Sequence, residues 1–179
     1  MKYWRMAMRE GEGGPNRFPD CKQRGIAALD VFSRKTGQRV VEDCRKLTAD
    51  EYEARWRQRA PHYPSGRYSL RQLWQEMKCG DVIFAKIGPK AVGKGVITAE
   101  YAFDPKILAG VREMGKKWGH FVRVQWEEDF PPFSFRFSVP RFTVRKLEGK
   151  ELEKLSRAEK LARKDKGQPL GRSIRMGIR

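Results

Sequence analysis

The sequence has few of the residues that build metal centres and disulfide frameworks. It contains three cysteines and two histidines among 179 residues, and Cys21, Cys44 and Cys79 lie far apart without any C-x-x-C pair. Structural zinc sites need Cys and His ligands at short, regular spacings. We therefore expect incidental reduced thiols, no metal and no cofactor.

Long hydrophobic runs are also missing. The opening MKYWRMAMREG is interrupted by charge, and no later segment approaches the roughly 20 apolar residues that span a bilayer. The pattern of a secretory signal peptide is absent as well. The sequence therefore predicts a cytoplasmic protein that makes no contact with a membrane.

Acidic residues are too few to balance the basic ones. Lys and Arg number 39 against 22 Asp and Glu, which gives a formal net charge of +17. Heat-adapted surfaces raise Lys and Glu together, whereas here one sign dominates. Because such a field attracts polyanions, nucleic acid is the leading partner class.

What the chain does contain is a series of short patterned segments. They predict strands at 2–10, 24–32, 80–87, 95–103, 120–126 and 141–147, and helices at 48–59, 69–78, 104–115 and 149–166. Thr48 and Ser69 are predicted helix N-caps, and Glu51 completes a capping box with Thr48. The helices do not alternate strictly with the strands, which disfavours a doubly wound parallel sheet. We expect an α+β fold with a curled mixed β-sheet, a pseudo-barrel, and flanking helices.

The charged end of the sequence is predicted to lie outside this domain. From Glu148 onward the chain carries ten basic and five acidic residues, so most of the positive charge belongs to the part before it. We expect residues 1–147 to form the domain, and residues 148–179 to form a charged helix and a linker or tail.

The segment KIGPKAVGKG is one residue short of a nucleotide-binding loop. Gly88, Gly93 and Lys94 satisfy G-x-x-x-x-G-K, but Gly95 replaces the Ser or Thr that ligates Mg²⁺. The next residues, VITAEYAF, are β-branched and aromatic and favour a strand, whereas a phosphate-binding loop leads into a helix. We therefore predict a glycine-rich hairpin connection and no nucleotide hydrolysis.

Four stretches together resemble the PUA-like superfamily, especially its YTH and EVE branches. They are KYWRMAM, KQRGIAAL, CGDVIFAKIGPKAVGKGVITAEY and KWGHFVRVQWEEDFPP. They resemble, in order, the opening strand, the K-G-V-W-S-T stretch, the central hairpin, and the strand that ends in Trp before a Pro. The resemblance covers residues 1–147 and implies a PUA-like, YTH-like fold that binds nucleic acid. YTH domains read N6-methyladenine by turning the base out into an aromatic cage.

The resemblance also implies positions for that cage. Trp118 matches a cage position, Ala28 matches the position beside the cage tryptophan, and Ala27 stands where YTH proteins place a stacking tryptophan. Another ring would have to supply the missing wall, and an acidic side chain would read the Watson–Crick edge of the base. The candidates are Trp4, Phe18 and Phe103 for the ring and Asp30 for the acid.

Basic side chains and one histidine are expected to contact the nucleic-acid backbone. These are Arg17, Lys90, Lys94, Lys116, Lys117, His120 and Arg123. A basic domain that ends in a charged linker also resembles the N-terminal reader domain of archaeal McrB-type restriction enzymes, which an AAA+ GTPase motor follows. The resemblance thus implies a non-enzymatic specificity module for modified DNA.

Two other functions fit the same residues. An RNA-binding PUA-like module would stack single-stranded bases on the same rings. A nuclease on a related scaffold would need a metal site, for which the acidic run Glu127–Asp129 is the candidate. Competition between RNA and DNA of one sequence, and incubation of both with Mg²⁺, would separate the three functions.

Overall fold

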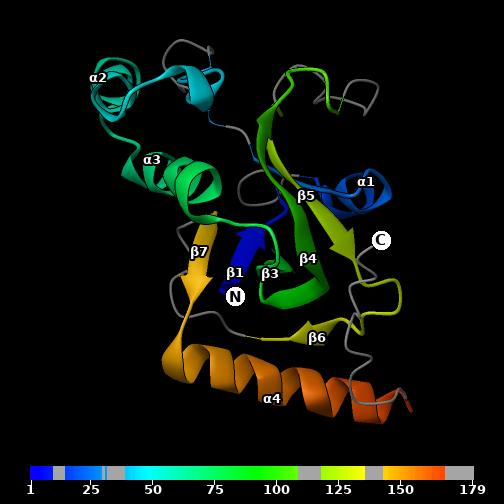
Figure 1. The fold of residues 1–179 in the computed structure, drawn as a ribbon. Coiled ribbons are helices and arrows are strands. Elements are labelled where there is room, and N and C mark those ends of the chain that lie inside the picture. The colour runs from blue at the N-terminus through cyan, green and yellow to red at the C-terminus, as the bar shows by residue number, and fades with distance from the viewer. Residues whose placement is uncertain (10–14, 30, 32–38, 109–117, 136–142, 168–179) are drawn as a thin grey trace.

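A seven-stranded mixed sheet forms the centre of the computed structural model, which describes residues 1–9, 15–29, 31, 39–108, 118–135 and 143–167 (Figure 1). The strands are β1 Tyr3–Ala7, β2 Ile26–Leu29, β3 Val82–Ile87, β4 Lys90–Phe103, β5 His120–Trp126, β6 Phe133–Ser134 and β7 Val144–Leu147. Their order is β2-β5-β4-β3-β1-β7, with β6 paired to β4. The β1–β3 pair is parallel, and the other described pairs are antiparallel. The described strands do not close into a barrel.

Helices surround this sheet on several sides. They are α1 Phe18–Gln23, η1 Cys44–Lys46, α2 Ala49–Arg59, α3 Pro64–Arg71, η2 Gln72–Glu76 and α4 Gly149–Asp165. In Figure 1, α2 and α3 lie at one side of the view and α1 at the other, while α4 crosses the end of the molecule near β6. The α+β class expected from the sequence is confirmed.

The predicted capping box is present at the start of α2. The Thr48 hydroxyl accepts a hydrogen bond from the Glu51 N–H at 3.3 Å, and the Glu51 carboxylate accepts one from the Thr48 N–H at 2.7 Å. The predicted helix start at Ser69 is wrong, because α3 begins at Pro64. Proline suits the first helical turn, and the buried Ser69 hydroxyl instead accepts from the Val144 N–H at 3.2 Å.

The KIGPKAVGKG segment is a β-hairpin, as its composition predicted. Strand β3 ends at Ile87 and β4 begins at Lys90, so the connection is only Gly88 and Pro89, with Gly88 at φ +53°. Strand β4 therefore starts at Lys90 and not at Gly95, where the sequence pattern placed it. A strand follows the glycines, so the segment lacks the helix end that binds phosphate in a nucleotide-binding loop.

Close packing explains two glycines of this hairpin. A Cβ atom on Gly93 would lie 2.1 Å from Phe18 Cζ. A Cβ atom on Gly95 would lie 2.5 Å from Val124 Cγ1 and 2.7 Å from the carbonyl oxygen of Gln125. The two glycines therefore allow α1 and β5 to pack directly against the backbone of β4.

Apolar side chains form two buried clusters. The larger one contains Trp4, Trp56 and most of the buried residues of the sheet. The smaller one joins α4 to the sheet, because the fully buried Leu155 belongs to it together with Phe84 of β3. Helix α4 thus packs against the sheet, although the proposed domain boundary at residue 147 stays a prediction.

Two predicted segments fall partly or wholly outside the described residues. The start of the helix predicted at 104–115 is not helical, because residues 105–108 form turns; residues 109–115 and residues 168–179 of the tail lie outside the described part. Within the described ranges, no helix combines the length and the apolar character that a membrane span requires.

Candidate nucleic-acid interface

An aromatic cluster of Tyr101, Phe103 and His120 lies where β4 ends and β5 begins. The ring centroids of Phe103 and His120 are 5.0 Å apart, and those of Tyr101 and His120 are 6.0 Å apart. Strand register brings these rings together, since His120 pairs with Phe103 on one side and with Leu29 of β2 on the other. Gly119 makes room for them, because a Cβ atom there would lie 2.7 Å from Phe103 Cε2.

His120 is the polar centre of the aromatic cluster. Its Nδ1 lies 2.9 Å from the Tyr101 hydroxyl, within hydrogen-bond distance, and that hydroxyl accepts a hydrogen bond from the Cys44 N–H at 3.1 Å. Burial, aided by the nearby Arg39 charge, lowers the pKa of His120 to about 3, so the ring is neutral at physiological pH. Nε2 makes no hydrogen bond of ordinary geometry to the described residues, although the Val41 backbone approaches the ring and partly offsets the pKa shift.

Cationic side chains flank the aromatic cluster. The guanidinium carbon of Arg39 lies 5.3 Å from the centroid of the Phe103 ring, which is a cation–π distance. Arg59 of α2 supports this segment by donating to the carbonyl oxygen of Arg39 at 3.2 Å. Lys106 is exposed just beyond the end of β4. Sequence reasoning missed Arg39 and Tyr101, although the Tyr101-x-Phe103 spacing signals two rings on one side of a strand.

Five residues predicted for the site lie in or next to this end of the sheet. Ala27 and Ala28 are in β2, pair with β5, and are fully buried. Trp118 lies just before β5, but its indole is 5% exposed and belongs to the larger core cluster. Phe103 is only partly buried, and His120 is fully buried. Of the five, Phe103 therefore presents the accessible ring, whereas the Trp118 indole is a core side chain.

The other predicted rings lie elsewhere. Trp4 is fully buried in β1, and its indole N–H donates to the Asp81 carboxylate at 2.9 Å. Phe18 begins α1 and meets Trp126 edge-on, with ring centroids 5.1 Å apart. Neither ring belongs to the aromatic cluster. Asp30 lies outside the described residues.

The residues predicted to contact the nucleic-acid backbone differ in exposure. Lys90 is exposed at the start of β4, and Arg123 is exposed in the middle of β5. Arg17 is only 4% exposed and His120 is fully buried, so phosphate contact by either would require its neighbours to move. Lys116 and Lys117 lie outside the described residues.

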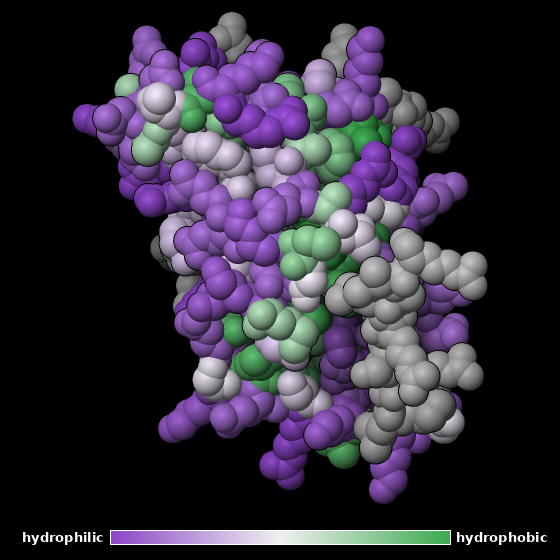
Figure 2. All heavy atoms as spheres, viewed as in Figure 1, coloured by the Kyte–Doolittle hydropathy of each residue, from purple (hydrophilic) through white to green (hydrophobic). Residues whose placement is uncertain are grey.

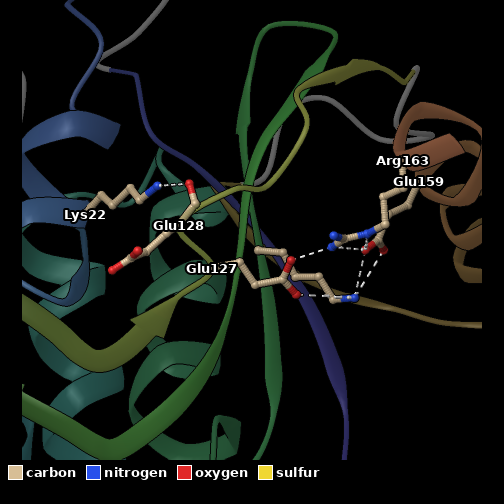
Figure 3. Close-up of polar contacts among 6 residues, drawn as sticks. Lys22, Glu127, Glu128, Glu159 and Arg163 are labelled. Atoms are coloured by element: carbon tan, nitrogen blue, oxygen red, sulfur yellow. Dashed lines mark hydrogen bonds and ion pairs between the residues drawn. The ribbon is translucent and has the colours of Figure 1, made fainter. Parts of the chain in front are cut away.

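Lys94 belongs to an ion-pair network that joins α4 to the sheet (Figure 3). Its Nζ lies 3.0 Å from Glu159 Oε1 and 3.8 Å from Glu127 Oε1. Arg163 bonds to the same two carboxylates, at 2.7 Å to Glu159 Oε1 and also to Glu127. The four side chains, called here the ion-pair network, neutralise one another and hold Lys94 away from other anions.

The acidic run considered for Mg²⁺ is partly engaged in the same region. Glu127 is held by the two cations of the ion-pair network, while the carbonyl oxygen of Glu128 accepts a hydrogen bond from Lys22 Nζ at 2.8 Å (Figure 3). The Glu128 and Asp129 side chains are exposed. Across the ranges that the structure describes, no three His, Cys, Asp or Glu side chains are grouped to hold a metal ion.

A polar cavity of about 330 Å³ lies between α3, η2, β7 and the start of α4. Its lining consists of Tyr68, Gln72, Glu76, Arg145, Lys146, Glu148 and Glu151. None of the residues predicted for base or backbone contact lines this cavity. It is therefore separate from the aromatic cluster.

Residues 4–138 match the model of a family described as a domain of unknown function, DUF8426. The chain belongs to the DUF8426 family. The matched range includes the whole aromatic cluster and ends before α4 of this DUF8426 chain begins. No curated protein matches the chain.

Solved structures resemble the DUF8426 chain at low sequence identity. A protein from Agrobacterium tumefaciens is 17% identical with a TM-score of 0.43, over 90% of this chain and 95% of that one. A hypothetical protein from Leishmania major is 12% identical with a TM-score of 0.45, over 90% of this chain and 96% of that one. A protein from Pseudomonas syringae is 14% identical with a TM-score of 0.41, over 88% and 99%. At such values the function must be argued from the residues of the DUF8426 chain itself.

Proposed function

We propose that this DUF8426 domain is a non-enzymatic nucleic-acid reader that takes an everted, modified base, N6-methyladenine in DNA, at the aromatic cluster. The observation that carries the proposal is the formal net charge of +17. A surface with this surplus binds polyanions by releasing their counterions. The base-reading part rests on the geometry of the aromatic cluster and on the YTH resemblance.

Three carboxylates that would otherwise repel a polyanion are engaged within the fold. Asp81 accepts hydrogen bonds from the Trp4 indole and from the Lys2 N–H, and Glu127 and Glu159 belong to the ion-pair network. Hydrophilic side chains cover most of the face in Figure 2, including the region over α2 and α3. Exposed cations include Lys46, Lys90, Lys106 and Arg123. Positive charge therefore remains at the surface for a partner.

The aromatic cluster has the parts that an everted base needs. The Arg39 guanidinium covers the face of the Phe103 ring, where a base could stack if the guanidinium moved to a phosphate. The neutral His120 ring is fully buried, so its Nε2 could meet the edge of the base only after the residues around it moved. Eversion costs a few kcal/mol, stacking returns about 1–3 kcal/mol, and a desolvated methyl group adds about 0.8 kcal/mol. Trp118 would form the back of such a pocket and not its outer wall.

The wider context of the proposal comes from the same resemblance. A PUA-like fold of the YTH and EVE type would accommodate the mixed sheet, with the base entering beside β2 and β5. In this proposal the domain is the specificity module of a modification-dependent restriction system, joined to an AAA+ GTPase motor as in McrB-type enzymes.

Fluorescence anisotropy with matched DNA duplexes, with and without one N6-methyladenine, tests the proposal at two salt concentrations. We expect both duplexes to bind, both affinities to fall as salt rises, and the methylated duplex to bind more tightly. Phe103→Ala should weaken binding of the methylated duplex by about 5- to 150-fold, the equivalent of one stacking contact. Tyr68→Ala, which removes an exposed ring at the polar cavity, is the matched control and should leave affinity unchanged.

Each part of the proposal fails separately. Equal affinity for the two duplexes would remove base reading and leave nucleic-acid binding in place. Preference for RNA of the same sequence would replace DNA by RNA as the partner. Mg²⁺-dependent cleavage of either strand type would contradict the non-enzymatic role. Absence of binding even at low salt would overturn the whole proposal.

A further inference from the structure

Helix α4 presents two chemically different faces. Its inner face carries the fully buried Leu155 and the partners of the ion-pair network, Glu159 and Arg163. The outer face is exposed and consists of Lys150, Glu153, Lys154, Arg157, Lys160, Leu161 and Lys164. At 3.6 residues per turn these seven positions fall within an arc of about 120°. The outer face thus carries five cations and one carboxylate.

We propose that the outer face of α4 is a second nucleic-acid contact that binds the phosphate backbone of a duplex. The inference rests on the proposed function and extends it, because it assigns backbone attraction to a surface away from the aromatic cluster. Among the residues that the structure describes, none of the five outer cations belongs to an ion pair. Their i, i+3 and i, i+4 spacings place like charges side by side, which destabilises an isolated helix by a few tenths of a kcal/mol per pair. A polyanion would remove that repulsion.

The ion-pair network fixes the direction in which the outer face points. Lys94 belongs to β4 and Glu127 directly follows β5, whereas Glu159 and Arg163 lie on the inner face of α4 (Figure 3). Leu155 adds an apolar anchor on the same side. Because the helix is already held, binding of a duplex would not incur the cost of ordering it.

The arrangement favours nucleic acid over an anionic membrane. A helix that lies in a membrane surface inserts an apolar face, whereas here Leu155 is buried against the sheet and Leu161, 56% exposed, is the one large apolar side chain of the outer face. The stripe from Lys150 to Lys164 is about 21 Å long. A duplex carries about 12 phosphates over that length.

This surface lies far from the aromatic cluster. From Lys94, which bonds to α4, strand β4 continues to Phe103 over a distance of up to about 30 Å. In Figure 1, α4 crosses the end of the molecule opposite to the β4–β5 tip. Charges on α4 should therefore change affinity for any duplex without changing discrimination between methylated and plain bases.

Salt-dependent anisotropy on the full chain tests this inference. The α4 variant carries Lys150→Gln, Lys154→Gln and Arg157→Gln. The control variant carries Arg55→Gln, Arg57→Gln and Arg71→Gln, an equal loss of exposed charge on α2 and α3. For the α4 variant we expect the slope of log affinity against log salt to shrink by about 2–3 and duplex affinity to fall at least about tenfold. The control should lose much less, and both variants should keep the wild-type ratio between methylated and plain duplexes.

The outcomes separate this inference from the proposed function. Equal losses in the two variants would show an effect of net charge alone and would overturn the α4 contact. The α4 contact would also be overturned if the wild-type protein bound duplex no better than the α4 variant. That result would leave the proposed function unaffected. If the wild-type chain binds no nucleic acid, both fall. Binding to phosphatidylserine–phosphatidylcholine vesicles that disappears in the α4 variant, without an effect on duplex binding, would make a membrane the partner instead.

Discussion

The two ends of strand β4 bury polar groups in opposite ways. Beside its last residue, a neutral chain runs from the Cys44 N–H through the Tyr101 hydroxyl to His120. Nearer its start, Lys94 enters a network of two cations and two carboxylates whose side chains are between 9% and 25% exposed. The first end is deep in the larger core, and the second is at the edge where α4 joins the sheet.

The difference follows from the cost of desolvating charge. A charged group that loses water entirely needs an excellent partner, so the deep end keeps its histidine neutral. At the edge, partial contact with solvent lowers the desolvation cost of the ion pairs. These pairs hold α4, whose outer face is basic. We therefore expect the first end to bind a neutral group such as a base, and the second end to bind the charged phosphate backbone of a nucleic acid.

The largest effect should come from removing the indole at the deep end. Trp118→Ala should lower the free energy of unfolding by about 3–5 kcal/mol, because it empties a large buried site. Urea denaturation measures this, with the exposed Tyr68→Ala as control at about 0.5 kcal/mol or less. A Trp118→Ala protein of normal stability that had lost nucleic-acid binding would instead make the indole a ligand contact.

Acid should destabilise the deep end through His120. Its folded pKa of about 3 lies below its ordinary value near 6.5, so the unfolded chain takes up the proton first. The stabilising contribution is therefore complete above about pH 6.5 and is lost as the pH falls towards 3, at up to about 1.4 kcal/mol per pH unit. His120→Phe should abolish this part of the pH dependence, whereas replacement of the exposed His62 should not. An unchanged profile in His120→Phe would contradict the assignment.

A methyl group placed between β4 and β5 tests the middle of the strand. Gly95→Ala should cost about 1–3 kcal/mol of unfolding free energy, because the new Cβ would meet the backbone of Gln125 as well as Val124. Thr98→Ala, at an exposed position of the same strand, provides the comparison. Thermal denaturation of both variants is sufficient, and equal stability of the two would show that Gly95 is not needed for packing.

The smallest effect is expected at the charged edge. Glu159→Gln keeps the shape of the side chain but removes one charge from the ion-pair network, and it should cost about 1–2 kcal/mol. Hydrogen exchange of the α4 amides should accelerate, because the helix loses part of its hold on the sheet. The exposed Glu153→Gln should leave exchange unaltered. Equal protection of α4 in the two variants would argue that apolar contacts alone hold the helix.

Local signals predicted much of the fold. The Thr48–Glu51 capping box and the hairpin at Gly88 depend on neighbouring residues, and both are present. Helix α1 was missed because Phe18 and Pro19 follow a glycine-rich stretch that resembles a loop. Helix α3 begins at Pro64 and not at the predicted Ser69, because proline suits the first helical turn. The serine was interpreted as an N-cap, which placed the start of the helix too late.

The site was harder to predict because its contacts are distant in sequence. The YTH resemblance placed Trp118 in the base cage, yet tertiary packing buries its indole. No local sequence pattern predicts the ion pair between Lys94 and Glu159, since 65 residues separate them. Such pairings depend on the path of the whole sheet, which periodicity does not specify.

The place of β1 has a consequence for how the protein is made. Tyr3, near the start of the chain, pairs with Val82 on one side and with Leu147 on the other. During synthesis one edge of β1 therefore stays unpaired until β7 has left the ribosome. Because these pairings join residues far apart in the sequence, formation of the sheet should be slow, and chaperone dependence should concentrate on the segment that contains β1.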